Sequence, residues 1–189
     1  MSERNTVIRS LHDVGLAAWF GGSVAGAVGI NGAAADVPDR TQRLRVANAG
    51  WGRWSPVNLA AIGAHLVGGA GLLYANKGRV AGQKGVAAST VAKLVLTGAA
   101  LGATAWSGAL GKKLSQYDGA SVEGGTEPAP ETPAEVAKAQ QQLKVLQWLI
   151  PGLTGGIVVL TSVHGEQQRP SQQLPGILQK PAQLIGAAS

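Results

Sequence analysis

The fold is decided by an uncharged stretch of 22 residues, VGLAAWFGGSVAGAVGINGAAA, at positions 14–35. About 20 apolar residues in an α-helix cross the hydrocarbon core of a bilayer. The small residues of this stretch recur at spacings of three and four, so one side of the helix is smooth enough for a neighbouring helix to approach closely. The residues predicted on this packing side are Gly15, Ala18, Gly22, Gly26 and Gly29.

Three further apolar stretches predict membrane helices. They occupy residues 57–75, residues 94–111 and the second half of a longer helical pattern at residues 132–164. Pro151 lies inside this last pattern and is expected to kink it, because proline removes a backbone donor and crowds the preceding turn. The predicted fold is therefore all-α: an integral membrane helical bundle with about four Gly/Ala-rich helices, a long kinked fourth helix and a flexible tail. Further glycines predicted to pack against neighbouring helices are Gly98, Gly102, Gly152 and Gly156.

The chain divides into four regions. Residues 1–113 should hold the first three membrane helices and their loops, including a polar loop at residues 36–56. Residues 114–131 are rich in Gly, Pro, Glu, Thr and Ser and predict a flexible linker. Residues 132–164 predict a helix that runs from water into the membrane, and residues 165–189 predict a disordered or extended tail. Apolar pairs in this tail are candidate docking points for a partner: Ile177, Leu178, Leu184 and Ile185.

The helical pattern at residues 132–164 also contains a heptad repeat. Its apolar residues alternate spacings of three and four, which is typical of a coiled-coil seam. Only the Gln/Lys-rich part between Val136 and Leu146 tests the register, because nearly every position beyond Trp148 is apolar. The pattern predicts a seam that joins copies of the chain: Val136, Leu143, Leu146, Ile150, Leu153, Ile157 and Leu160.

Composition excludes several classes of site. The chain has no cysteine, so disulfides, thiolate metal sites and cysteine nucleophiles are absent. Its formal net charge is +6, and Lys and Arg lie almost wholly between the apolar stretches, which favours anionic lipid headgroups over nucleic acid as partners. Ser10, His12 and Asp13 are close in sequence, but neighbouring positions on a helix do not face one another. No catalytic residue, metal site or nucleic-acid partner is predicted.

His65 is the one ionisable residue within the predicted spans and is the candidate cofactor-binding residue. The favoured interpretation is a neutral histidine hydrogen-bonded to a neighbouring helix, and the alternative is a cofactor ligand or proton relay. His12 and His164 are expected at one membrane interface, about 15 Å from His65 along the helix axis. Axial ligands of one iron lie about 4 Å apart, so no bis-histidine site within one chain is expected. Interhelical hydrogen bonds are expected from Ser23, Asn31, Thr97, Thr104, Thr154 and Thr161.

The first helix resembles the first-helix pattern of small four-helix membrane families. The similarity covers residues 11–22 and consists of Leu11 and His12 followed by Trp19, Gly21 and Gly22. The families are the uncharacterised DUF4149 group and the copper-resistance CopD-like proteins. The resemblance implies a four-helix membrane bundle, with a metal or redox association in the CopD-like group. The chain has no cysteine and a single methionine, at its start, so it lacks the soft ligands that copper prefers.

Three functions are compatible with these features. The favoured one is a non-enzymatic, self-associating membrane anchor or scaffold for a protein complex, with membrane lipids and copies of itself as partners. The alternative is a redox-accessory membrane protein that holds a quinone or other lipophile in an apolar cavity near His65; no other cofactor is predicted. The third is an apolar oligomeric scaffold that does not fully span the bilayer.

The predicted location is the cytoplasmic (inner) membrane. A cleaved signal peptide is the competing interpretation of residues 14–35, since Arg4 and Arg9 precede them and small residues end them. The stretch is longer than a usual signal core, and Asp13 interrupts its basic start. Lys and Arg divide equally between the two sides of the predicted bundle, so the positive-inside rule does not choose an orientation.

Overall fold

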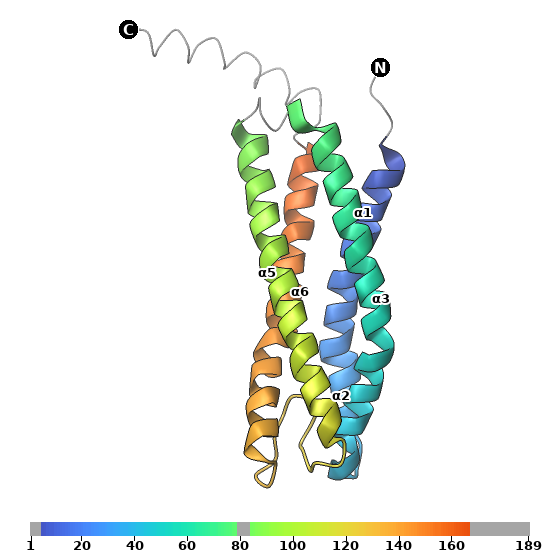
Figure 1. Cartoon of the computed structure of the whole chain (residues 1–189), viewed down its shortest axis with the longest axis vertical. Coiled ribbons are helices and arrows are strands. Elements are labelled where there is room, and N and C mark those ends of the chain that lie inside the picture. The colour runs from blue at the N-terminus through green and yellow to red at the C-terminus, as the bar shows by residue number, and fades with distance from the viewer. Residues whose placement is uncertain (1–4, 79–83, 167–189) are drawn as a thin grey trace, which may run out of the picture.

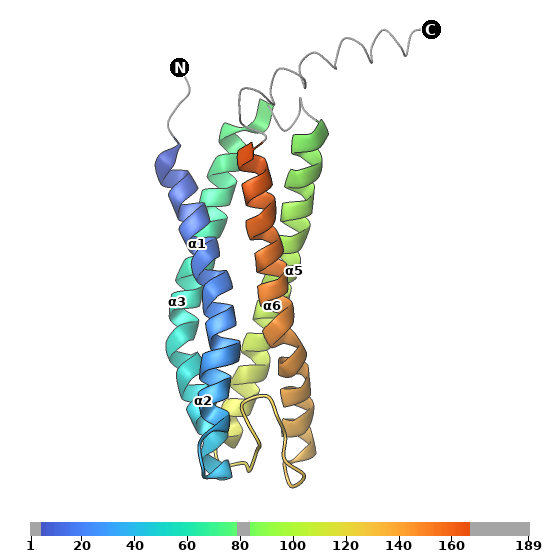
Figure 2. The same ribbon diagram turned by 180° about the vertical axis from the view of Figure 1, so that it is seen from behind.

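The computed structural model describes residues 5–78 and 84–166. These residues form long helices that stand side by side and run alternately up and down (Figure 1). The start of the first helix and the end of the last one lie at the same end of the molecule, as expected for an even number of crossings (Figure 1 and Figure 2). The helices are α1 (Thr6–Ala25), η1 (Gly26–Ile30), α2 (Asn31–Ala35), α3 (Arg40–Ala75), α5 (Lys84–Leu114), η2 (Ser115–Tyr117) and α6 (Ala134–Glu166).

Four helical stretches of the described chain are long and apolar enough to cross a membrane. They are Thr6–Ala35, Arg40–Ala75, Ala87–Tyr117 and Ala134–Ser162. At about 1.5 Å per residue each of them is longer than the roughly 30 Å thickness of a hydrocarbon core. The all-α fold with four apolar helices is confirmed, and α6 continues as one helix through Pro151.

The polar loop expected at residues 36–56 is largely helical, which corrects the sequence analysis. The helix α3 begins at Arg40, and the carboxylate of Asp39 caps it by accepting a hydrogen bond from Thr41 N at 2.9 Å. Leu44 and Ala47 are buried on the inner side of this extension, while its arginines lie mainly on the other sides. The arginines gave this segment a loop-like composition, although it is an amphipathic helix.

Residues 115–133 pack onto the bundle and do not form the open, flexible linker expected from their composition. The side chain of Val122 is fully buried, and its backbone N–H donates to Arg40 O at 3.3 Å. The buried Gln140 of α6 donates from Nε2 to Gly124 O at 2.8 Å. These contacts hold the segment against α3 and α6, where it closes one end of the bundle (Figure 2).

The helix α6 begins close to the predicted position, and Thr132, just before it, bonds within the preceding segment. Thr132 Oγ1 accepts a hydrogen bond from Ala129 N at 2.8 Å and donates to Ser121 O at 2.6 Å. The carboxylate of Glu135 accepts from Tyr117 and pairs with Lys113 at 3.3 Å. The two residues therefore fix the preceding segment and the end of α5.

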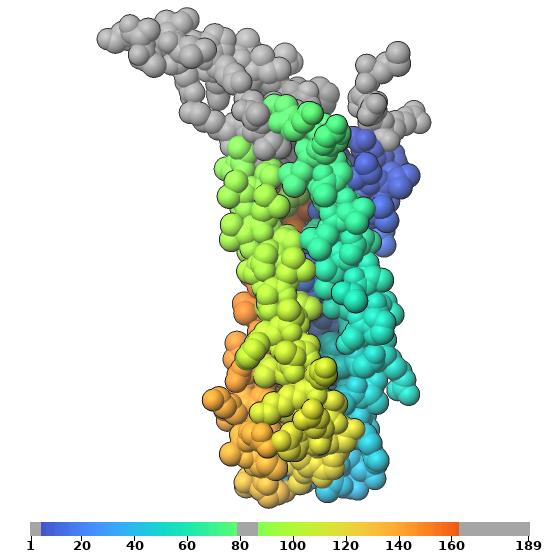
Figure 3. All heavy atoms as spheres, in the orientation of Figure 1, coloured from blue at the N-terminus to red at the C-terminus, as the bar shows by residue number. Residues whose placement is uncertain are grey.

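The helices associate as two pairs. The helix α1 packs along α3, and α5 packs along α6, while α1 also contacts α6 (Figure 2). Contact between α3 and α5 is confined to a few places. On the face drawn in Figure 3, α5 and α3 are separated along part of their length, and atoms of α1 and α6 are visible between them. The bundle therefore has one incompletely closed side.

The heptad seam faces the interior of this one chain. Val136, Leu146 and Ile150 belong to a core cluster with residues of α3, α5 and the 115–133 segment, and Ile157 is fully buried. Leu153 packs against a second cluster, which contains Trp19, Ile62 and Ala100. The periodicity describes the inner side of α6 correctly, but the buried members of the seam have no free surface for a second copy. The remaining seam residues, Leu143 and Leu160, are half-buried.

The glycines divide into two groups. Gly15 lies against the backbone of α3, where a Cβ would be 2.5 Å from Ala61 O and 2.6 Å from His65 N. Gly22 and Gly26 lie beneath tryptophan side chains of α3, and Ala18 is half-buried beside them. Gly156 makes a looser contact, 3.3 Å from Leu96 Cδ1. Contrary to the expectation of packing, a Cβ would meet nothing within 4 Å at Gly29, Gly98, Gly102 and Gly152.

The expected docking pairs Ile177, Leu178, Leu184 and Ile185 lie outside the described residues, as does the rest of the tail after residue 166.

Candidate functional site

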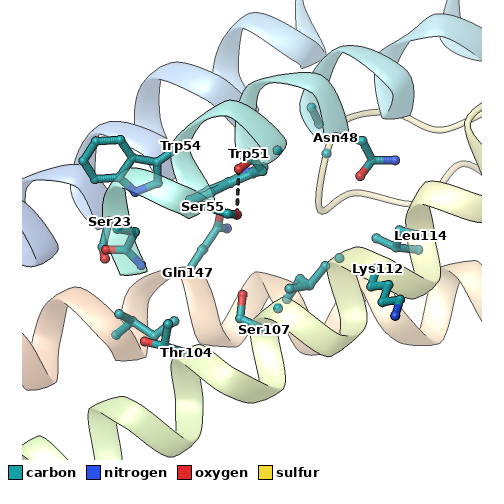
Figure 4. A pocket seen from close by; sticks show the side chains of 18 of the residues that line it. Ser23, Asn48, Trp51, Trp54, Ser55, Thr104, Ser107, Lys112, Leu114 and Gln147 are labelled. Atoms are coloured by element: carbon teal, nitrogen blue, oxygen red, sulfur yellow. Dashed lines mark hydrogen bonds between the residues drawn. The ribbon is translucent and has the colours of Figure 1, made fainter. Parts of the chain in front are cut away.

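A cavity of about 570 Å³ lies on the incompletely closed side of the bundle. Residues of α1, α3, α5 and α6 line it together with Gly125 and Thr126 of the packed 115–133 segment. Figure 4 shows Trp51 and Trp54 of α3 on one side and Thr104 and Ser107 of α5 on the other. Its wall combines apolar groups such as Leu59 and Ile62 with amide and hydroxyl side chains, as in sites for small amphipathic molecules.

The tryptophan wall of the cavity depends on two glycines of the first helix. The indole of Trp54 lies over Gly22, and the indole of Trp51 lies over Gly26, so that a Cβ at either glycine would overlap the ring. The five-residue π-helical segment η1 begins at Gly26. An inserted residue of this kind rotates the following side chains around the helix, and such segments are frequent at functional sites. The first residue after it is Asn31.

Asn31 joins three helices at the base of the cavity. Its Oδ1 accepts from Trp51 Nε1 at 2.9 Å, and its Nδ2 donates to Gln147 Oε1 at 2.8 Å. Gly125 approaches the same amide, since a Cβ there would lie 2.8 Å from Asn31 Oδ1. This confirms that Asn31 makes interhelical hydrogen bonds and shows that the indole of Trp51 is held by the protein itself.

Two polar atoms of the cavity wall have no protein partner in the described chain. Trp54 Nε1 and Asn58 Oδ1 are buried, and neither makes a hydrogen bond. Leaving a buried donor or acceptor unpaired costs about 1–3 kcal/mol. Both residues line the cavity, so a non-protein molecule within it is the natural partner for both atoms.

Charges are sparse around the cavity. Lys112 is the one charged side chain among the described residues that line it, and it is exposed at the end of α5. The neighbouring Lys113 is paired with Glu135 at 3.3 Å. Acidic groups lie farther out, where Glu123 binds Arg40 at 2.9 Å and Arg43 at 3.2 Å. The cavity is therefore suited to a polar, uncharged group more than to a cation.

Two carboxylates at this end of the molecule, Asp39 and Glu131, have pKa values that local hydrogen bonds lower. Hydrogen bonds from Thr41 lower the pKa of Asp39 below its ordinary value. The hydroxyl of Ser121 donates to Glu131 at 2.7 Å and is the main cause that lowers the pKa of that carboxyl, with a smaller effect of Arg40. Both side chains are in the polar segments that connect helices.

The predicted candidate His65 lies outside the cavity, at the contact of α1 with α3. Its Nδ1 donates to the backbone oxygen of His12 at 3.1 Å. This agrees with the expected hydrogen bond between His65 and a neighbouring helix. The ring of Trp19 meets the His65 ring edge-on, with centroids 6.2 Å apart.

His12 and His65 lie side by side, which corrects the expected separation of about 15 Å. Their ring centroids are 4.4 Å apart, and His12 Nδ1 bonds Asp13 Oδ1 at 2.7 Å. The expectation placed His12 at the edge of the bundle. In the structure α1 starts at Thr6, and its first turns lie beside the stretch of α3 that ends at Gly71, so the two histidines share one level. Rings packed against each other leave no room between them for a porphyrin.

Other polar residues of the spans have mixed roles. Thr104 Oγ1 accepts an interhelical hydrogen bond from Trp19 Nε1 at 3.3 Å, as predicted. Ser23, Thr154 and Thr161 instead donate to carbonyls of their own helices. Among the described residues no three His, Cys, Asp or Glu side chains converge on a point that could hold a metal ion.

No family model matches the chain, and no curated protein or solved structure is significantly similar to it. The two families that the first helix resembles are therefore not supported.

Sequence reasoning did not find the cavity residues Trp54 and Asn58. The available signal was the spacing of Trp51, Trp54 and Asn58, which are three and four residues apart and share one side of a helix. The composition of residues 36–56 hides this signal, because it predicts a loop, in which a helical spacing has no meaning.

Proposed function

We propose that this chain is a non-enzymatic integral protein of the cytoplasmic membrane that holds an amphipathic molecule, such as a quinone or a lipid, between α3 and α5. The observation that carries the proposal is the cavity of about 570 Å³ on the open side of the bundle, with buried polar atoms that the protein leaves unpaired. It retains the lipophile-binding function considered from the sequence but moves the site away from His65.

Outward-facing side chains support insertion into a bilayer. Large apolar residues are exposed on all four long helices, for example Val14 at 68%, Val67 at 65%, Val95 at 65% and Val159 at 63%. In water this would leave extended apolar surfaces uncovered on every side of the molecule, whereas lipid chains cover them without cost. A carbonate wash of membranes should leave the chain in the pellet.

The open side of the bundle supports entry of a ligand from the bilayer. Leu59 of α3 lines the cavity and is 72% exposed, so the wall of the cavity continues onto the surface that faces lipid. An apolar tail can therefore remain among lipid chains while the polar group of the same molecule lies inside. A site open only to water would favour a wholly polar ligand.

Mass spectrometry of molecules extracted from the purified, intact chain tests this function. We expect a defined amphiphile to copurify with the wild type, and Gly108→Leu to reduce its amount because the new side chain enters the cavity. Gly98→Leu is the matched control, since Gly98 is on the same helix but does not line the cavity, and a Cβ meets nothing within 4 Å at either position. Equal amounts in all three proteins, or none in any of them, would overturn the proposal.

The second candidate is the self-associating membrane anchor or scaffold. One observation favours it: the outer side of α5 exposes Gly98 and Gly102, whose positions four residues apart would let a second copy approach the backbone closely. The heptad seam of α6 does not serve this function, because its central residues are buried within the chain. For this function we propose the glycine side of α5 as the surface of association.

Crosslinking in membranes and mass measurement in detergent test the anchor function. If α5 forms a dimer, we expect the double variant Gly98→Leu and Gly102→Leu to abolish it. Ile157→Ala is the control in the α6 seam. It should lower the stability of the fold, and the protein that remains folded should keep the oligomeric state of the wild type. A monomer without a copurifying protein would leave the scaffold without support.

A further inference from the structure

The two unpaired atoms of the cavity define what an occupant has to offer. Trp54 Nε1 is a donor, and Asn58 Oδ1 is an acceptor. The residues are four positions apart on α3, so they share one side of the helix and are displaced by about 6 Å along its axis. A molecule that satisfies both atoms needs an acceptor for the indole N–H and a donor for the amide oxygen.

Four neighbouring polar side chains of the wall are already paired. Trp51 and Gln147 are both bonded to Asn31. The hydroxyl of Ser55 donates to Trp51 O at 2.7 Å, as drawn in Figure 4, and Ser23 donates to its own helix. The unpaired atoms are therefore a local feature of Trp54 and Asn58 and do not reflect a generally unsatisfied wall.

The unpaired atoms of Trp54 and Asn58 lie apart from Lys112, the charged residue at the outer edge of the cavity. The helix α5 runs antiparallel to α3, and its residues Thr104 and Ser107 lie across the cavity from Trp54 in Figure 4. Asn58 lines the same cavity. Lys112 lies a full turn farther toward the end of α5, where it is exposed. An ionised group beside Asn58 would have no countercharge there, and burying such a charge is costly.

We propose that the occupant is a neutral lipid whose headgroup carries both a hydrogen-bond acceptor and a hydroxyl. The acceptor takes the indole N–H of Trp54, the hydroxyl donates to Asn58 Oδ1, and the apolar tail leaves the bundle between α3 and α5 past Leu59. The inference rests on the proposed function and names the ligand class of that site. A diacylglycerol and a quinol both carry this chemistry, whereas an oxidised quinone offers acceptors alone.

The geometry also explains why the bundle tolerates an open side. The protein supplies few contacts between α3 and α5, and a headgroup bonded to α3 and packed against Thr104 and Ser107 would complete this side. Binding of the neutral lipid then raises the stability of the bundle, because a ligand that binds the folded state stabilises it.

The test uses the full chain in phosphatidylcholine nanodiscs and native mass spectrometry with four probes. The probes are a diacylglycerol, a ubiquinol, the matching ubiquinone and an anionic phosphatidylglycerol. We expect diacylglycerol or ubiquinol to be retained, and Trp54→Phe and Asn58→Leu each to weaken retention roughly tenfold, the effect of one hydrogen bond in a dry site. Trp54→Phe removes the indole N–H and keeps an aromatic side chain at this position, and Gly98→Leu, outside the cavity, should leave retention of the neutral probes unchanged.

The results separate the alternatives. Ubiquinone should bind more weakly than ubiquinol and should respond to Trp54→Phe but not to Asn58→Leu. Preferential retention of phosphatidylglycerol that is lost in Lys112→Gln would overturn the neutral ligand and keep the proposed function. If Trp54→Phe and Asn58→Leu both retain the probes as the wild type does, the assigned contacts are overturned. If no probe binds although thermal melting shows that the protein is folded, the result counts against the proposed function as well.

Discussion

The helix α3 meets its two neighbours in opposite ways. Toward α1 the backbones touch: Gly15 lies against Ala61, and Gly68 lies against the backbone of Ile8 and His12. Toward α5 the same helix makes few contacts and borders a cavity of about 570 Å³. Both sides contain small residues, so glycine content alone does not distinguish a tight helix pair from a binding site. The difference depends on what the facing helix presents.

On the α1 side, glycines of each helix meet bulky or backbone groups of the other. Gly22 and Gly26 receive the tryptophans of α3, and Gly71 receives Ile8. On the α5 side, Gly108 and Gly111 face the cavity, and a Cβ on either of them would meet nothing within 4 Å. A glycine that faces a partner therefore indicates packing, and a glycine that faces nothing indicates space for a ligand or lipid.

The largest effect is expected from Gly15→Leu on the closed side. A Cβ at this position would overlap backbone atoms of α3, which cannot move independently, so the helices have to separate. We expect a loss of about 3 kcal/mol or more in the free energy of unfolding, measured by denaturant titration in detergent. Gly98→Leu is the control, because its side chain points into open space. Comparable unfolding midpoints for the two variants would break the comparison between the two sides.

A smaller loss is expected from Asn31→Leu at the base of the cavity. The substitution leaves Trp51 Nε1 and Gln147 Oε1 without their partner, which costs about 1–3 kcal/mol. The double variant with Gln147→Leu should lose less than the sum of the single variants, since it removes one of the stranded groups. Additive losses would show that the two amides do not depend on each other.

The sequence predicted the helical content and the positions of the apolar spans because these depend on local patterns. It also predicted which side of α6 is buried. It did not predict which surface covers that side, since a heptad repeat specifies the direction of apolar residues and says nothing of whether the partner belongs to the same chain. The buried Ile157 and Val136 are therefore in the core of one molecule.

The heights of residues on different helices along the bundle axis also could not be predicted from the sequence. The 15 Å between His12 and His65 was inferred from span edges that fall at different heights in the bundle. The cavity was unpredictable for the same reason, because it depends on the spacing of α3 and α5 and on the rotamers of Trp54 and Asn58. Each of these is a tertiary property without a periodic signature.

A stabilising change is expected from Asn58→Leu on the open side. In the lipid-stripped protein the substitution removes an unpaired buried acceptor and adds apolar surface, so the free energy of unfolding should rise by about 1 kcal/mol. Asn48→Leu is the matched control and should destabilise, because Asn48 Nδ2 donates to Asp118 Oδ1 at 2.6 Å. A loss of stability in both variants would mean that Asn58 is satisfied by the protein.

The smallest effect concerns the start of α3, the helix that both sides share. The pKa of Asp39 is lowered by hydrogen bonds from Thr41, so the ionised carboxylate favours the folded helix end. A lowered pKa means that this contribution is present at neutral pH and is lost as the pH falls through the ordinary aspartate range and below it. Because the other carboxylates at the same end of the molecule are present in both proteins, the difference between wild type and Asp39→Ser in acid-induced loss of hydrogen-exchange protection at the amide of Thr41 isolates the cap. Identical acid responses would show that the cap does not hold the first turn of α3, and that the buried Leu44 and Ala47 fix this end of the helix instead.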